Sequence, residues 1–141
     1  MSTSLLPDLA IGEIVRLHDF FAAWFTATPD AAIDFADCER AFAPDFRMIG
    51  PDGRIATMPG IVAWLRDARG TRQDGFSIAI HETRCVWQQG DAVLMEYVEE
   101  QTQAGETTRR QSCALFMRAH AAPGGVVWRH LQETWLQAPH I

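Results

Sequence analysis

The spacing of the apolar residues changes once along the chain, near residue 76, and this change limits the fold more than any other feature. Before it, apolar side chains recur at the spacing of a helix face, as in the stripe of Ile14, Leu17 and Phe21. After it, the chain is rich in Val, Ile and Thr and alternates in places as strands do. Helices that precede an antiparallel meander predict an α+β domain. Its long, bent antiparallel sheet would wrap the N-terminal helices and enclose a mostly apolar pocket.

Prolines and glycines set the expected ends of the elements. Asp8, next to Pro7, is expected to cap the first helix, and residues 1–6 to form a loose tail. Pro44 is expected to stop a second helix that carries Phe35, Cys38 and Phe42, because proline pushes the preceding residue out of the helical region. The other expected elements are short strands at 46–49 and 55–57, a helix from Pro59 to Gly70, and long strands at 76–87, 92–102, 109–118 and 126–136.

Length, charge and cysteine content exclude several classes of protein. A chain of 141 residues with 48% apolar and 21% charged residues is expected to form a single domain over residues 1–141. A net charge of -6, without any lysine, argues against a nucleic-acid partner. No apolar run is long enough to span a membrane, and the N-terminus lacks a secretory signal pattern. Three separated cysteines predict buried reduced thiols, as in a cytoplasmic protein.

The hairpin around Ala104 and Gly105 can be registered by hand. If the turn is centred between them, four pairs face each other: Glu99 and Arg110, Tyr97 and Ser112, Met95 and Ala114, Val93 and Phe116. Because side chains alternate along a strand, these eight share one face, which is apolar at one end and polar at the other. A pocket with an apolar floor and a few directed polar groups needs this pattern. The alternative is a Glu99–Arg110 salt bridge on a half-exposed sheet, since a shift of one residue would turn this face outward.

The register of the last strand is left open by the long loop over residues 119–125. In the preferred register Ser112 faces Gln132 and Ala114 faces His130, so that a histidine joins the polar end of the pocket. In the other register, Glu133 and Trp135 share the face of Arg110 instead.

Two histidines are candidates for proton transfer. His18 lies on the apolar stripe of the first helix, where an acid–base role and a buried structural role are both open. In the preferred register His130 lies near Glu99, and a histidine–carboxylate pair in an apolar pocket can carry proton transfer. A structural role in a polar network is its alternative. Trp24 is a candidate ligand contact, and a place in the core is its alternative.

The sequence has no metal-binding, nucleophile or phosphate-binding motif. HExxH and close His–His pairs are absent, and His130 and Glu133 would point to opposite faces of a strand. GxSxG and glycine-rich phosphate loops are also absent. We therefore expect neither a metal nor a cofactor.

Five short strings combine with the order of elements into a recognisable pattern: HDFFAAWF at 18–25, PDFRMIGPDG at 44–53, YVEEQ at 97–101, RQS at 110–112 and WRHLQETW at 128–135. Together they resemble the nuclear transport factor 2-like (NTF2-like) superfamily, and within it the SnoaL-like bacterial branch of uncharacterised single-domain proteins. The resemblance covers nearly the whole chain. It implies a cystatin-like cone of curved sheet closed by the helices, often as a homodimer packed through the sheet. Gln132 stands where this branch often carries a second histidine.

The resemblance does not supply an activity, because relatives on this fold include isomerases, cyclases, dehydratases, hydrolases and pure binding domains. The first hypothesis is a pocket that binds a small, mostly apolar organic molecule with a polar end. The alternatives are an enzyme of the isomerase, cyclase or hydrolase type, with Glu99 or His130 as general base, and a homodimeric interaction module without catalysis. The residues expected around the ligand are His18, Trp24, Met95, Tyr97, Glu99, Arg110, Ser112, His130 and Gln132.

Overall fold

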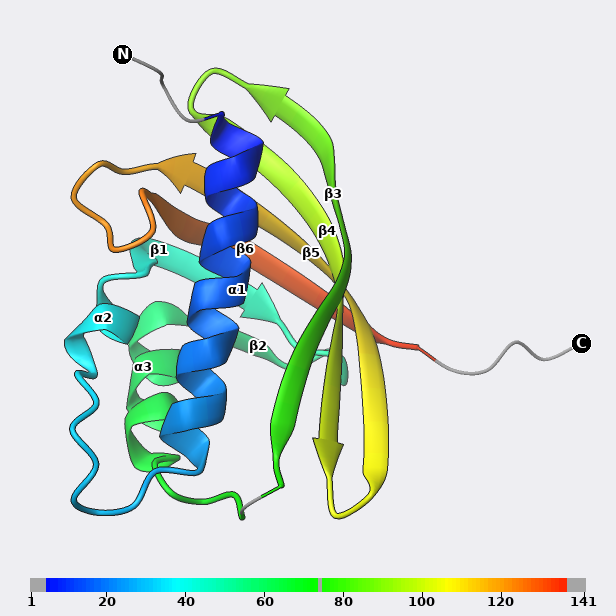
Figure 1. Cartoon of the computed structure of the whole chain (residues 1–141). Coiled ribbons are helices and arrows are strands. Elements are labelled where there is room, and N and C mark those ends of the chain that lie inside the picture. Colours follow the sequence, from blue (N-terminus) through cyan, green and yellow to red (C-terminus); the bar gives the residue numbers. More distant parts are fainter. Residues whose placement is uncertain (1–4, 74, 137–141) are drawn as a thin grey trace, which may run out of the picture.

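The computed structural model describes residues 5–73 and 75–136, which form three helices and six strands in an α+β arrangement, as predicted (Figure 1). The helices are α1 (Leu6–Phe25), α2 (Ala36–Glu39) and α3 (Met58–Asp67). The strands are β1 (Phe42–Ile49), β2 (Ile55–Thr57), β3 (Ser77–Gln89), β4 (Ala92–Gln103), β5 (Glu106–Arg118) and β6 (Val126–Trp135).

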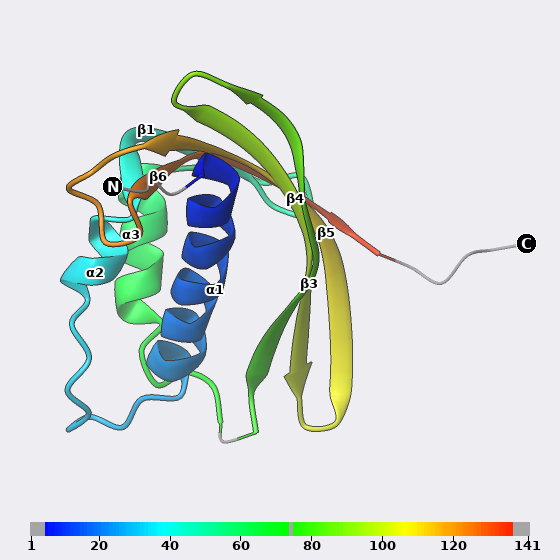
Figure 2. The same ribbon diagram turned by 45° about the horizontal axis from the view of Figure 1, so that its top comes forward.

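The six strands of the described chain form one sheet in the order β2-β1-β6-β5-β4-β3. Neighbouring strands are antiparallel, as predicted, except β1 and β6, whose parallel pairing departs from the expected antiparallel sheet. The sheet is curved, and its concave side faces the helices, with α1 lying across it and α3 beside α1 (Figure 2). This arrangement places a helix layer over one side of the sheet, and no described element covers the other.

Irregular pairing in β3 accompanies the curvature of the sheet. The register between β3 and β4 shifts between His81 and Arg84 and again between Cys85 and Trp87. Glu82, within the first irregularity, has a positive φ of 55°. Extra residues of this kind bend a strand and increase its twist, so they help β3 to wrap around α1.

The helix α1 packs on the sheet through the apolar stripe that its sequence predicts. Leu6, Ala10, Ile14 and Leu17 are all buried. Leu6 already belongs to the helix, which starts without a side-chain cap, so the expected capping by Asp8 is wrong. The rest of the expected loose tail, apart from Leu5, lies outside the described residues. No helix in the described part of the chain is both long and apolar enough to cross a membrane.

The expected second helix is wrong apart from a single turn. Only Ala36–Glu39 is helical, and Phe42, expected on the helix, begins strand β1. Pairing between β1 and β6 is interrupted between Phe42 and Arg47, and Pro44 falls in this gap. A proline there removes no hydrogen bond from the ladder, so it is tolerated within a strand.

The predicted register of the β4–β5 hairpin is confirmed. Glu99 pairs with Arg110 and Tyr97 with Ser112, around a turn in which Ala104 and Gly105 have φ of 52° and 79°. Positive φ at both central residues is the two-residue turn that matches the twist of paired strands. Val93, Met95, Tyr97 and Glu99 are at most 4% exposed, so this face points to the concave side, as predicted.

The preferred register of the last strand is wrong where it concerns the pocket. Phe116 pairs with Trp128, but Leu115 pairs with His130, so Arg129 is an extra residue in β6. Beyond this bulge, Ser112 pairs with Glu133 rather than with Gln132. The inserted residue reverses the alternation, so that Trp128 and Glu133 both face the concave side although they are an odd number of residues apart.

Candidate functional site

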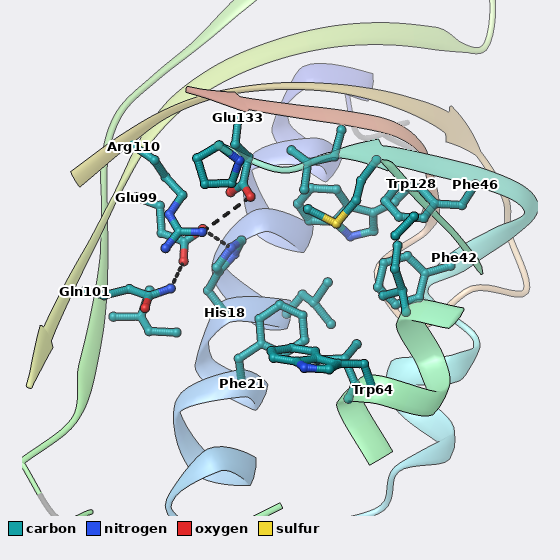
Figure 3. Close-up of a pocket in the computed structure, with 18 of the residues that line it drawn as sticks. His18, Phe21, Phe42, Phe46, Trp64, Glu99, Gln101, Arg110, Trp128 and Glu133 are labelled. Atoms are coloured by element: carbon teal, nitrogen blue, oxygen red, sulfur yellow. Dashed lines mark hydrogen bonds and ion pairs between the residues drawn. The ribbon is translucent and has the colours of Figure 1, made fainter. Parts of the chain in front are cut away.

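A cavity of about 420 Å³ lies between α1, α3 and the concave side of the sheet (Figure 3). This volume falls within the range of small-molecule sites. Its walls are mainly aromatic and aliphatic; the aromatic side chains are those of Phe21, Phe25, Phe42, Phe46, Trp64 and Trp128. The polar side chains in its lining are those of His18, Glu99, Gln101, Arg110 and Glu133. The labelled polar groups gather toward one end in Figure 3, away from Phe42 and Trp64, so the cavity has an apolar part and a polar part.

Neighbouring elements bring these polar groups together. His18 projects from the buried face of α1, one turn after Ile14. Glu99 and Arg110 face each other across β4 and β5, and Glu133 follows on β6 opposite Ser112. Gln101 lies two residues after Glu99, on the same face of β4.

His18 and Glu99 form a buried ion pair. His18 Nδ1 donates to the carbonyl oxygen of Ile14 at 2.7 Å, and Nε2 lies 3.0 Å from Oε1 of Glu99. The carbonyl can only accept, so Nδ1 carries a hydrogen, and an ionised Glu99 then requires a second hydrogen on Nε2. Burial opposes both charges, yet the attraction between them raises the pKa of His18 and lowers that of Glu99 to about 2. Gln101 donates to the other carboxylate oxygen of Glu99 at 2.6 Å.

Glu133 is held more loosely than Glu99. Arg110 Nη1 donates to its Oε1 and Ser112 Oγ to its Oε2, each at 3.4 Å, which is long for a hydrogen bond. Burial and the negative charge of Glu99 raise the pKa of Glu133 to about 6, against the opposing pull of Arg110. Glu133 is therefore the carboxylate in this cavity that can change its charge near neutral pH.

Arg110 is positioned by stacking as much as by hydrogen bonds. Its guanidinium lies 4.7 Å from the ring centroid of Trp135, whose indole N–H donates to Asp52 in the turn between β1 and β2. Its Nε is buried and has no acceptor among the described residues. Arg110 thus presents a cation with unused donor capacity at the polar end of the cavity.

The structure brings three of the predicted ligand contacts into the cavity lining: His18, Glu99 and Arg110. Four others are buried in the core without lining it: Trp24, Met95, Tyr97 and Ser112. The Tyr97 ring packs 5.7 Å from that of His18, and the Trp24 indole donates to the carbonyl of Leu65. Ser112 likewise donates to Glu133, so these three side chains contact the lining from the core.

The predicted roles of His130 and Gln132 in the pocket are wrong. They pair with Leu115 and Cys113, and these alternate with the buried Ala114 and Phe116, so both lie on the convex side of the sheet. Sequence reasoning missed Glu133 and Gln101 as pocket residues. Gln101 could have been predicted, because it lies two residues after Glu99 on the same strand and therefore on the same face. Glu133 faces the pocket only in the other register of the last strand, which was not the preferred one.

Comparisons with solved structures agree with this architecture. An NTF2-like protein of unknown function from Pseudomonas aeruginosa superposes with a TM-score of 0.81 at 27% identity, over 92% of this chain and 99% of that one. The CaMKII hub of S. rosetta gives a TM-score of 0.76 at 14% identity, over 96% and 100%. A domain of unknown function with a cystatin-like fold from Nostoc punctiforme gives 0.69 at 15% identity, over 96% and 81%. No family model and no curated protein matches the chain.

The SnoaL-like branch stays a prediction, because the matched structures support the superfamily and do not single out that branch. The curved sheet, the helices on its concave side and the likeness over almost the full length of the Pseudomonas aeruginosa protein lead to one assignment. The chain belongs to the NTF2-like superfamily.

Proposed function

We propose that the protein binds a small, mostly apolar organic molecule that carries a polar group at one end. The observation that carries this proposal is the cavity of about 420 Å³, with its aromatic walls and its charged groups gathered toward one end. The aromatic walls would remove the apolar body of a ligand from water, which contributes most of the binding free energy at such sites. The charged groups would fix its orientation.

The polar group of the ligand would meet Arg110 and Glu133 rather than His18 and Glu99. Both nitrogens of His18 and both oxygens of Glu99 already have partners at 3.0 Å or less. Arg110 and Glu133 share one long bond of 3.4 Å, so either can turn to a ligand at small cost. The His18–Glu99 pair then keeps its own partners and stays in place beneath them.

Filling the cavity tests the proposal. Ala56 on β2 lines the cavity, whereas the adjacent Ile55 is 58% exposed, so Ala56→Phe should fill the pocket and Ile55→Phe should leave it open. We expect 2-naphthaleneethanol to raise the melting temperature of the wild-type protein and of Ile55→Phe, but not that of Ala56→Phe. Equal shifts in all three proteins, or none in any of them, would contradict a ligand site in this cavity.

Acid–base catalysis is a second candidate function, and the state of Glu133 is the observation that favours it. A carboxylate whose pKa is about 6 can accept and return a proton near neutral pH. Glu99, with a pKa of about 2, is a weak base, and His130 lies on the convex side. Deuterium incorporation next to the carbonyl of 2-naphthylacetone, followed by NMR in heavy water, tests this function. The wild-type protein should accelerate it and Glu133→Gln should not; equal rates would refute Glu133 as the base.

We also propose that two copies pair through the convex side of the sheet. Trp87, Leu94, Leu115 and His130 are successive cross-strand partners on this side, and Trp87 is 46% exposed. The likeness to a solved structure named as a putative calmodulin-dependent kinase II association domain supports this pairing. Light scattering at micromolar concentration should give the mass of a dimer, and Trp87→Glu should reduce it to that of a monomer. A monomeric wild-type protein would refute the pairing.

A further inference from the structure

Two pairs of opposite charge face the cavity, and they are held very differently. His18 and Glu99 are 3.0 Å apart, and their remaining polar atoms bond to Ile14 and Gln101. Arg110 and Glu133 meet at 3.4 Å, and the bond from Ser112 to Glu133 is equally long. A ligand can therefore displace Glu133 from Arg110 without breaking a short hydrogen bond, whereas the first pair resists exchange.

Arg110 has the donor capacity to take a new partner. A guanidinium offers five N–H donors, and among the described residues only Glu133 accepts one of them, at 3.4 Å. Its Nε is buried without an acceptor. A carboxylate is the acceptor whose geometry matches this group best, because its two oxygens can receive two parallel N–H bonds. Stacking on Trp135 holds the guanidinium plane in place for such an exchange.

The charge balance of the pocket limits which ligands it can take. His18 and Arg110 carry two positive charges, and Glu99 and Glu133 carry two negative charges when both are ionised. An amine would add a positive charge that nothing offsets, and a carboxylate would add an unmatched negative charge. Net charge in a largely apolar cavity is costly. A proton taken up by Glu133 cancels the charge of a carboxylate ligand and breaks no short hydrogen bond. To cancel the charge of an amine, His18 would have to lose its proton, and its short ion pair with Glu99 would be lost with it.

We propose that the pocket binds an apolar carboxylic acid in its ionised form, that the carboxylate pairs with Arg110, and that Glu133 takes up one proton as the ligand binds. This inference rests on the proposed pocket function and specifies its ligand class and pH dependence. The ligand arrives as an anion and stays one. The proton comes from solvent and ends on the carboxyl group of Glu133, so the net charge of the pocket does not change.

The surroundings of Glu133 support this exchange. Arg110 from β5 and His18 from α1 are the positive groups near it, and Glu99 from β4 is the negative one. Burial, then Glu99 and Glu133, raise the pKa of Tyr97 well above its usual value, so this neighbour stays neutral. In the turn between β1 and β2, Asp52 accepts a hydrogen bond from the indole of Trp135. A second carboxylate at Arg110 would add to the repulsion from Glu99 and favour protonated Glu133 further.

The effect on binding can be worked out from the state of Glu133 in the free protein. With a pKa of about 6, about half of the molecules carry the proton at pH 6 and about 1% at pH 8. The apparent dissociation constant is the intrinsic one divided by the competent fraction. It should therefore rise about fiftyfold from pH 6 to pH 8 for a carboxylate, which stays ionised over this range.

Isothermal titration calorimetry with two matched probes tests the inference. One probe is 2-naphthylacetate and the other is its neutral amide, 2-naphthylacetamide, each measured at pH 6 and pH 8. The carboxylate should bind about fiftyfold more weakly at pH 8, and the amide should bind equally well at both pH values. At pH 8, buffers of different ionisation enthalpy should report the uptake of close to one proton per bound carboxylate and none per bound amide.

Two variants assign the effect to the residues. Glu133→Gln should bind the carboxylate with the same affinity at pH 6 and pH 8, whereas Glu106→Gln, at the exposed start of β5, should behave as the wild type. The double variant Arg110→Gln with Glu133→Gln removes both charges together, and it should keep amide binding while losing carboxylate binding. If the amide binds but the carboxylate shows no pH dependence or binds better at pH 8, the inference is wrong and the pocket stands. If neither probe binds, both are wrong.

Discussion

Glu133→Gln should make the protein more stable, although it removes a buried ion pair. Glu133 is ionised at pH 8 in a buried position near a second carboxylate, and its interaction with Arg110 does not offset these costs. Glutamine keeps the shape and an oxygen for Ser112 and Arg110, but it carries no charge. The variant therefore resembles the wild-type protein with Glu133 protonated.

The magnitude follows from the pKa of Glu133, which rises from 4.5 to about 6 on folding. Each factor of ten in proton affinity corresponds to about 1.4 kcal/mol, so ionised Glu133 costs about 2 kcal/mol of the free energy of unfolding. Because the pKa is raised in the folded state, this group favours folding below pH 4.5, and that contribution is lost as the pH rises through about 6. Glu133→Gln should match the wild type near pH 4 and exceed it by about 2 kcal/mol at pH 8.

Urea unfolding at pH 4, 6 and 8 measures this difference, with m-values compared to confirm that the extent of unfolding is unchanged. In a thermal scan at pH 8, the same difference should raise the melting temperature by about 4 to 8 °C. Glu106→Gln is the matched control, since its side chain is exposed and should change stability by less than about 0.5 kcal/mol at every pH. A variant less stable than the wild type at pH 8, or one with the same difference at every pH, would refute the reasoning.

Two further predictions concern other buried groups on α1 and β4. A Cβ atom at Gly124 would overlap the carboxylate of Glu13, which is buried and binds Trp128. Gly124→Ala should therefore cost about 2 kcal/mol or more in urea unfolding. Gly12→Ala, at an open position within α1, should stabilise by up to about 1 kcal/mol. Glu99→Gln leaves His18 without its counter-charge and should cost about 3 to 5 kcal/mol near pH 7. The pKa of Glu99 is lowered to about 2, so its contribution is present above pH 4.5 and fades as the pH falls toward 2.

Two outcomes would contradict these predictions. Equal stability of Gly124→Ala and Gly12→Ala would show that the loop before β6 moves away from Glu13 at no cost. A deficit in Glu99→Gln that stays the same from pH 7 to pH 3 would show that the ion pair with His18 does not supply it.

The parts of the site that follow from the sequence depend on local rules. Alternation along β4 and the short turn at Ala104 and Gly105 determine the hairpin register, and this register places Glu99 opposite Arg110. The helical stripe of α1 likewise turns His18 toward the sheet. Each of these features is specified by residues within one element or one hairpin, so no distant contact is needed to recover it.

Tertiary pairing determined the rest. Pro44 and Phe42 suggest the end of a helix when read locally, but parallel pairing with β6 makes them part of a strand with a gap at the proline. The sequence predicts a strand over residues 126–136, and this strand is present as β6. The bulge at Arg129 is not visible locally, because an inserted residue does not change the kinds of residue before and after it. That bulge turns Glu133 into the cavity and His130 out of it. The sequence by itself therefore determined the α+β order and the Glu99–Arg110 pair. The pairing of β6 with its neighbours in the sheet decided that Glu133 is the ionisable group beside them, because a strand's register depends on its partners as well as on its own residues.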